Sequence, residues 1–144
     1  SLSDYSYAQL EQIDRRIKLS GVALEMFKDH PLFGVGLNNF VVRLPEYGDR
    51  PEVAWFLQPV HNIFLLVLSE TGLIGFGFLI YFLLNLVKKF QISHPKGRAD
   101  FKFQIALLVI LITGVTDHYW LTLQQTQILF AITLGLFTRA AVKS

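Results

Sequence analysis

Four ionisable side chains lie beside or inside long apolar runs. His61 precedes one such run, Glu70 lies within it, and Asp117 and His118 follow a second one. Histidine near neutral pH can take up a proton as a general base, and a carboxylate can orient it. His61 is equally explained as an ordinary polar cap. No two of these four side chains have the spacing of a metal site on one helix face, so we expect no metal.

Arg15 and Arg16 are candidates for binding an anion. Apolar residues in this region recur at helical spacing in two stripes, one with Leu10 and Ile13 and the other with Leu19. At about 100° per residue, Arg15 falls on the second stripe and Arg16 between the stripes. An arginine among apolar neighbours tends to be paired or to hold an anion, because it keeps its charge. A surface arginine whose stem covers apolar side chains explains either residue as well.

The composition narrows the class of protein. The chain has 144 residues, of which 52% are hydrophobic and 17% charged, with no Cys; its mean hydropathy is +0.42. These values exclude a disordered chain, a disulfide scaffold and a cysteine-ligated metal. Residues 1–60 have a net charge of −2 and residues 61–144 a net charge of +4. The basic residues form no stripe with interleaved aromatics, so we expect no nucleic-acid partner.

The apolar runs predict helices that cross a membrane. We expect about three crossings, over about residues 62–87, 103–120 and 121–138, because about 20 apolar residues span a bilayer. Basic residues gather between the first two runs and after the third, which places both basic clusters and the C-terminus in the cytoplasm and residues 1–60 outside. The fold class is therefore all-α, with multi-pass membrane helices after a mostly helical external region. A soluble protein with buried helices is the alternative.

The external region divides into a helix and an irregular part. Its periodicity predicts an amphipathic helix over about residues 7–30, covered on both apolar stripes and ended by Pro31. Gly34-Val35-Gly36 predicts a tight turn, with a short helix possible after it, and is no dinucleotide fingerprint. Further prolines and Gly48 predict an irregular loop up to residue 60.

The first crossing has several expected features near its outer end. Asn62 is the expected N-cap, and counting back from Lys88 puts the outer hydrocarbon boundary near Leu68. Glu70 then lies at or just inside that boundary, where an ionisable residue usually marks function. Glycines at 72, 75 and 77 suit close helix packing that would shield Glu70 from lipid. In a continuous helix His61 and Glu70 fall on opposite sides, so a direct bond requires His61 to lie off the axis.

Asp117 and His118 end the second predicted crossing. The topology places them in the same external layer as His61 and Glu70, which makes them possible accessory residues. Their alternative is an interfacial position beside the aromatic pair Tyr119 and Trp120.

Two blocks resemble the O-antigen ligase and O-antigen polymerase family of bacterial membrane glycosyltransferases. The first runs from Arg16 through the stretch from Asp29 to Phe40, which ends HPLFGVGLNNF. The second is His61-Asn62, nine residues, then Gly72-Leu73, with Glu70 inside. The resemblance covers residues 15–87, so we interpret the chain as the C-terminal part of a larger helical membrane enzyme. Because upstream helices would complete the lipid-carrier cavity, we expect the chain alone to be inactive.

The resemblance implies a reaction and its residues. The donor would be a glycan on undecaprenyl diphosphate, and the acceptor a hydroxyl of lipid A–core or another glycan, at the outer face of the bacterial cytoplasmic membrane. No cofactor or metal would be needed. His61 would be the general base, assisted by Glu70, while Arg16 or Arg15 would hold the diphosphate. An O-antigen polymerase or a protein O-oligosaccharyltransferase is the alternative within the family. A transporter fragment or non-catalytic membrane subunit is the alternative of another class.

Overall fold

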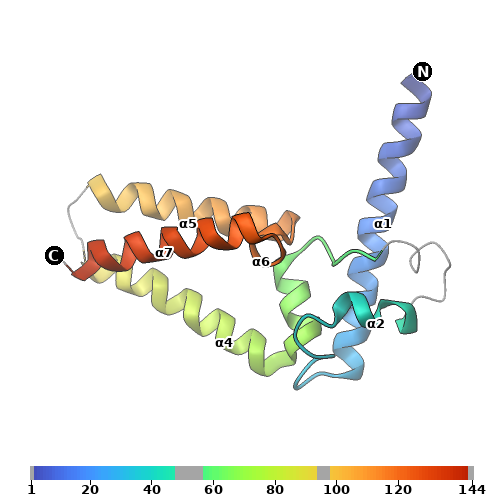
Figure 1. Ribbon diagram of the computed structural model, residues 1–144, viewed down its shortest axis with the longest axis horizontal. Coiled ribbons are helices and arrows are strands. Elements are labelled where there is room, and N and C mark those ends of the chain that lie inside the picture. Colours follow the sequence, from blue (N-terminus) through green and yellow to red (C-terminus); the bar gives the residue numbers. More distant parts are fainter. Residues whose placement is uncertain (1, 48–56, 94–97, 143–144) are drawn as a thin grey trace. The chain divides into compact units, whose positions relative to one another are not determined.

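The computed structural model describes residues 2–47, 57–93 and 98–142. Within these ranges the chain is helical and contains no strand, which confirms the predicted all-α class (Figure 1). The helices in these ranges are α1 (Leu2–Asp29), α2 (Phe40–Tyr47), α4 (Ile63–Ser93), α5 (Arg98–Thr116), α6 (Tyr119–Thr122) and α7 (Gln124–Val142).

The chain forms two compact units, Ser1–Phe76 and Gly77–Ser144. The division falls inside α4, so the first unit contains α1, α2 and the beginning of α4. The second unit contains the rest of α4 with α5, α6 and α7. The boundary predicted between residues 60 and 61 separates water from membrane, which is a different property, and it stays a prediction.

Helix α1 confirms the predicted amphipathic helix and begins earlier, at Leu2. One of its stripes forms the core of the first unit with residues of α2, the segment before α4, and α4 itself. The buried members of this core are Leu19, Val22, Ala23, Met26, Phe40, Leu44, Val60 and Leu66. The amphipathic pattern therefore folds the external region by burying one side of α1.

The other stripe of α1 is not covered by the described part of the chain. Leu10, Ile13 and Ile17 are 61%, 55% and 65% exposed. The prediction that α1 is covered on both stripes is therefore wrong for the described residues. The reason is that α2, Val60 and Leu66 all pack against the same face of α1.

Helix α2 agrees with a short helix after the tight turn, and because it extends to Tyr47 it corrects the prediction of an irregular loop over this stretch. Phe40 and Leu44, one turn apart, are fully buried and attach this short helix to α1. Pro45 lies inside α2, where it removes one backbone donor from a helix of 8 residues. Residues 48–56 of the predicted loop lie outside the described residues, and Leu57 to Asn62 are non-helical.

Helix α4 holds the segment that is long and apolar enough to cross a membrane. The most apolar window of Ile63–Lys88 has a mean hydropathy of 2.2, and only 22% of that window is buried. A core helix of a soluble protein would be mostly buried, so this segment is unlike one. In the described part of α5 the apolar stretch Ile105–Thr116 is shorter than a span. Among the described residues, one of the three predicted crossings is thus long and apolar enough to span a membrane, and the multi-pass architecture is not confirmed.

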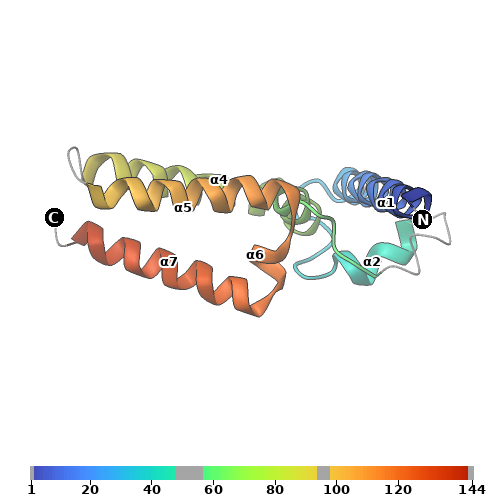
Figure 2. The ribbon, with the colours of Figure 1, turned by 90° about the horizontal axis from the view of Figure 1, so that it is seen from above.

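The second unit contains a small apolar core between α4, α5 and α7, the three long helices whose ribbons are drawn in Figure 2. Leu86 of α4 is buried and packs against Leu107 of α5 and Leu134 of α7. The predicted segments 103–120 and 121–138 correspond to α5 and to α6 with α7. Helix α5 ends at Thr116, and α6 is a single turn that leads into α7.

The core of the first unit can be tested with a matched pair of leucines. Leu44 is fully buried in α2, whereas Leu10 is 61% exposed on α1. We expect Leu44→Ala to lower the free energy of unfolding by about 2–5 kcal/mol, because it leaves a cavity. Leu10→Ala should change it by no more than about 0.5 kcal/mol. Denaturant titrations of the full-length protein in detergent would measure both, and equal losses would contradict the assigned core.

Candidate functional site

A loop is inserted into the hydrogen-bond ladder of α4. Gly72 has φ 63° and ψ −164°, which interrupts the helix. In an uninterrupted helix, Leu73 and Ile74 would donate to the carbonyls of Ser69 and Glu70. Here Leu73 N donates to Pro31 O at 2.8 Å, and Ile74 N to Leu32 O at 3.2 Å.

The same loop also satisfies the two carbonyls that the break would leave without a partner. Val35 N donates to Ser69 O and Gly36 N to Glu70 O, both at 2.9 Å. Four backbone hydrogen bonds between α4 and the loop thus replace two hydrogen bonds of an uninterrupted helix. Since buried backbone groups without partners are costly, the loop and the break stabilise each other. We call residues 31–36 the docked loop.

Two glycines make this close approach possible. Gly34 and Gly72 have φ of 67° and 63°, a backbone region that favours glycine. A Cβ on Gly34 would lie 2.3 Å from the Glu70 carbonyl carbon, and one on Gly72 would lie 2.4 Å from that of Leu32. The predicted turn at Gly34 is confirmed.

The predicted packing role of the glycines in α4 needs correction. Gly72 contacts a loop and breaks the helix, and a Cβ on Gly77 would meet no atom within 4 Å. A Cβ on Gly75 would meet the side chain of Thr71 in the same helix. Gly72 therefore allows close contact with the loop, and no close contact between helices is observed at Gly77.

Glu70 anchors the segment that follows the docked loop. Its side chain is 8% exposed, and its Oε2 and Oε1 accept bonds from Asn38 N at 2.9 Å and Phe40 N at 3.0 Å. Phe40 begins α2, so the carboxylate lies at a helix N-terminus, where the backbone donors and the helix dipole favour negative charge. The contacts of Glu70 are thus with loop backbone, a role that its sequence position alone did not indicate.

His61 lies immediately before α4, outside the helix. The predicted N-cap role of Asn62 is confirmed, because its Oδ1 accepts a hydrogen bond from Leu65 N at 3.0 Å. Val60, on the other side, is fully buried in the core of the first unit. His61 itself is half-buried. It is therefore fixed between a core residue and a helix cap, off the axis of α4.

The two candidate anion-binding arginines lie on α1. Arg15 is half-exposed and pairs with Glu11 one turn earlier, at 3.2 Å. Arg16 is exposed, and its carbonyl accepts a bond from the Ser20 hydroxyl at 2.8 Å. Both precede the buried stripe, which begins at Leu19. The first unit thus contains Arg15 and Arg16 on α1, Glu70 on α4, and His61 just before α4.

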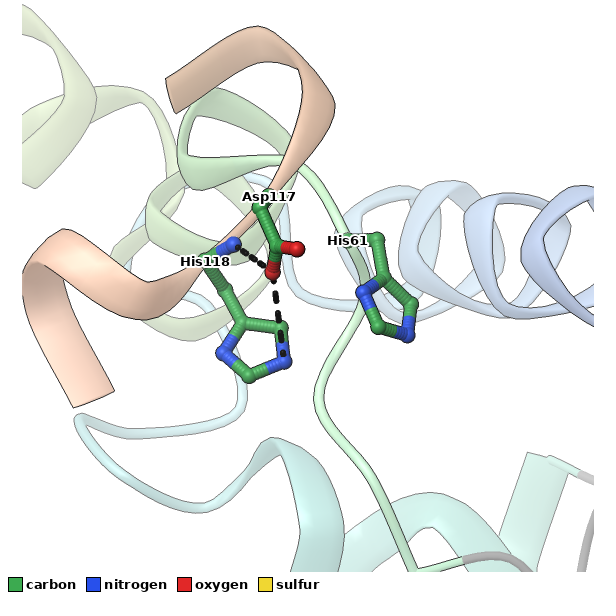
Figure 3. Close-up of side chains that lie close together, drawn as sticks. All are labelled: His61, Asp117 and His118. Atoms are coloured by element: carbon green, nitrogen blue, oxygen red, sulfur yellow. Dashed lines mark hydrogen bonds and ion pairs between the residues drawn. The ribbon is translucent and has the colours of Figure 1, made fainter. Parts of the chain in front are cut away.

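Asp117 and His118 form a local turn in the second unit (Figure 3). Asp117 Oδ1 accepts a bond from His118 N at 2.8 Å and lies 3.9 Å from His118 Nε2. His118 is 7% exposed, and its Nδ1 lies 2.6 Å from Thr122 Oγ1. These contacts hold the ring within its own turn. The predicted common depth with His61 and Glu70 involves both units and stays a prediction.

The predicted aromatic neighbours of this turn are engaged within it. The rings of His118 and Tyr119 meet edge to face with centroids 5.0 Å apart. Trp120 Nε1 donates to Thr113 Oγ1 of α5 at 2.7 Å. These contacts are explained by the turn itself and need no substrate; the alternative of an interfacial position stays a prediction.

A contact between α1 and α2 was not expected from the sequence. Burial, then a side-chain hydrogen bond with Asp29, raises the pKa of Tyr47 above its ordinary value of 10.0. Tyr47 is the last residue of α2 and Asp29 the last of α1. The contact therefore closes the end of the helix pair, and the phenol stays protonated at neutral pH.

The features of the first unit define a broken apolar helix with a loop docked into it. The chain belongs to the O-antigen ligase family, because a family model of that description matches residues 2–80, more than half of its length. Members of this family are glycosyltransferase-like enzymes associated with membranes. Searches of curated proteins and of solved structures find no match. The matched residues contain α1, the docked loop, His61 and the break at Gly72.

The carboxylate anchor can be tested by removing its charge. We expect Glu70→Gln to lower the free energy of unfolding by about 1.5–3 kcal/mol, because an amide cannot accept both backbone bonds. The matched control is Glu46→Gln, which removes an exposed pair with Arg43 at 2.8 Å and should cost about 1 kcal/mol at most. Denaturant unfolding of the full-length protein measures both. Equal stability of the two variants would contradict the anchoring role.

The break in α4 can be tested with a pair of glycines in the same helix. Gly72→Ala should prevent the loop from docking, because its Cβ would overlap the backbone of Leu32 and its φ is unfavourable for alanine. Gly77→Ala meets no atom within 4 Å and should be neutral or stabilising by about 0.5–1 kcal/mol. Limited proteolysis between residues 30 and 47 would report docking. Equal protection of both variants would overturn this account of the break.

Proposed function

We propose that the protein is an O-antigen ligase-like glycosyltransferase that uses a glycan on undecaprenyl diphosphate. The observation that carries the proposal is the position of His61, which is fixed between buried Val60 and the capping Asn62 within the matched segment. The backbone of His61 is thus held on both sides, which is a first condition for placing a general base beside its substrate. The acceptor would be a hydroxyl of lipid A–core or another glycan.

In this mechanism His61 takes the proton of the acceptor hydroxyl. The acceptor oxygen forms a bond to the anomeric carbon of the donor, while the bond from that carbon to the diphosphate oxygen breaks. Negative charge grows on the departing undecaprenyl diphosphate. Arg16, with Arg15 as the second candidate, would stabilise this charge through paired N–H donors. The donor is already activated by its diphosphate, so the proposed reaction needs no nucleotide, metal or cofactor.

Glu70 has a positioning role in this proposal. Its carboxylate holds the start of α2 against α4, and α2 packs against α1, which carries the arginines. Loss of Glu70 would thus disturb the spacing of Arg16 and His61 without removing either side chain. Asp117 and His118 stay possible accessory residues.

The proposed location is the outer face of the bacterial cytoplasmic membrane. The span in α4 and the membrane association of the family support it. The described part of α5 and α7 exposes many apolar side chains, for example Leu108 at 55%, Ile112 at 57% and Ile128 at 53%. Such surfaces are typical of helices that face lipid or other membrane helices, which favours a multi-pass arrangement with residues 1–60 outside.

The catalytic roles are tested by substitutions in the full-length protein. We expect His61→Ala to lower glycan transfer about 10²- to 10⁴-fold, the range for loss of a general base. Arg16→Ala should also lower it, and Arg16→Lys should recover part of the loss, because lysine lacks the planar fork. Surface glycan on a gel and transfer by purified protein are the measurements.

Matched controls separate catalysis from folding. His30→Ala and Arg43→Ala change a histidine and an arginine of the same unit and should retain transfer. His61→Ala should keep the parent unfolding temperature, whereas Glu70→Gln should lower both stability and transfer. Normal glycan at a normal protein level in the His61 and Arg16 variants would contradict their roles and favour a non-catalytic subunit or a transporter.

The gel also separates reactions within the family. Loss of a ligase leaves the lipid acceptor without glycan, whereas loss of a polymerase leaves acceptors with a single repeating unit. Loss of a protein O-oligosaccharyltransferase removes glycan from proteins instead. The family description favours the ligase.

A further inference from the structure

The docked loop has an apolar tip that faces outward. Leu32 and Phe33 are 56% and 72% exposed, whereas Val35 packs against the core of the first unit. No residue from 31 to 42 is charged. Surface turns usually carry polar residues, so an exposed apolar tip without charges indicates a contact with another apolar phase or partner.

The tip adjoins an exposed apolar part of the span in α4. Ile74 donates to Leu32 O, and Leu73 and Ile74 are 52% and 44% exposed just beyond the break. Leu32, Phe33, Leu73 and Ile74 thus belong to two segments joined by backbone bonds, and one of these segments is the membrane-span candidate. We call these four residues the apolar tip patch.

The depth of this patch follows from the length of α4. Lys88, the first charged residue after Glu70, lies sixteen positions after Gly72. This distance along the sequence corresponds to about 24 Å of helix, compared with a hydrocarbon core of about 30 Å. With Lys88 at the inner boundary, the break and the loop docked there fall near the outer boundary of the hydrocarbon, on its inner side.

Several backbone N–H groups of the loop are hydrogen-bonded within the protein, as a position near the hydrocarbon requires. Near hydrocarbon, polar backbone groups must be satisfied within the protein. Gly34 N donates to His30 O, Val35 N and Gly36 N donate to α4, and Asn39 N donates to Gly36 O. The N–H groups of residues 38 and 40 are held by the Glu70 carboxylate. The segment therefore satisfies these donors internally although it is irregular.

We propose that Leu32 and Phe33 insert into the outer leaflet of the bilayer as a second membrane contact beside the span. This contact would hold α1 and the loop close to the lipid surface, where the diphosphate of a lipid-linked donor must lie. The choice of leaflet and the link to the donor rest on the proposed function. Contact with lipid does not depend on transfer activity.

The test uses single cysteines, carrying a nitroxide label, in the full-length protein with no other cysteine. The protein is placed in nanodiscs of phosphatidylethanolamine and phosphatidylglycerol. Oxygen concentrates in the bilayer and a nickel chelate stays in water, so their collision rates with the label separate the two phases. Phe33→Cys and Leu32→Cys probe the tip, and Glu25→Cys on the exposed part of α1 is the water control.

We expect labels at positions 32 and 33 to favour oxygen over nickel several-fold and the label at position 25 to show the reverse. Equal nickel access at positions 33 and 25 would overturn the proposal by placing the tip in water. An immobilised label shielded from both reagents would also overturn it, by showing that another helix or a second copy covers the tip. An unchanged unfolding temperature controls for folding.

The measurement is independent of catalysis. Adding His61→Ala should abolish transfer and leave the oxygen and nickel collision rates at position 33 unchanged. Failure of the proposed function and failure of the membrane contact are thus recorded by different readouts.

Discussion

The arrangement of the first unit depends on one exchange of hydrogen bonds. The break at Gly72 frees two N–H groups and two carbonyls of α4, and residues 31–36 provide a partner for each of them. Neither element is stable in this form alone, because the broken helix would hold unsatisfied backbone and the loop would lack partners. Two parts of the sequence more than thirty residues apart are therefore coupled through their backbones. The side chain of Glu70 adds two more bonds to the same contact and extends it to the start of α2.

This contact also explains why the two blocks of family resemblance occur together. The first block supplies the loop, and the second supplies the carboxylate and the glycine that receive it. His61 lies just before the same half-helix, ahead of Asn62. The loop and the candidate base thus both adjoin the short helical segment from Ile63 to Thr71, which contains the anchor Glu70 and whose core residue Leu66 packs against α1. A change in docking is expected to move His61 relative to the arginines of α1.

The sequence predicted the regular elements well, and its errors have physical reasons. The apolar periodicity located α1, and Asn62 was identified as a cap, because both signals are local. The role of Glu70 was not predictable, since counting residues along α4 assumed a continuous helix. A glycine with positive φ and a glycine that serves helix packing look alike within an apolar run, so Gly72 gave no separate signal. The exposure of the Leu10 stripe was missed because periodicity shows that a face is apolar and not what covers it.

The two histidines next to apolar helices show why burial alone does not identify a catalytic base. His118 is the more deeply buried, yet its backbone N–H, its Nδ1 and its ring face each contact residues of its own turn. Those contacts explain its burial as part of the turn between α5 and α6. His61 is less buried, and it lies between the core residue Val60 and the helix cap Asn62. A general base must bring its ring within hydrogen-bond reach of the proton that it removes, and burial within a turn does not supply that reach. The burial of His118 is thus explained by its own turn and adds no argument for a catalytic role.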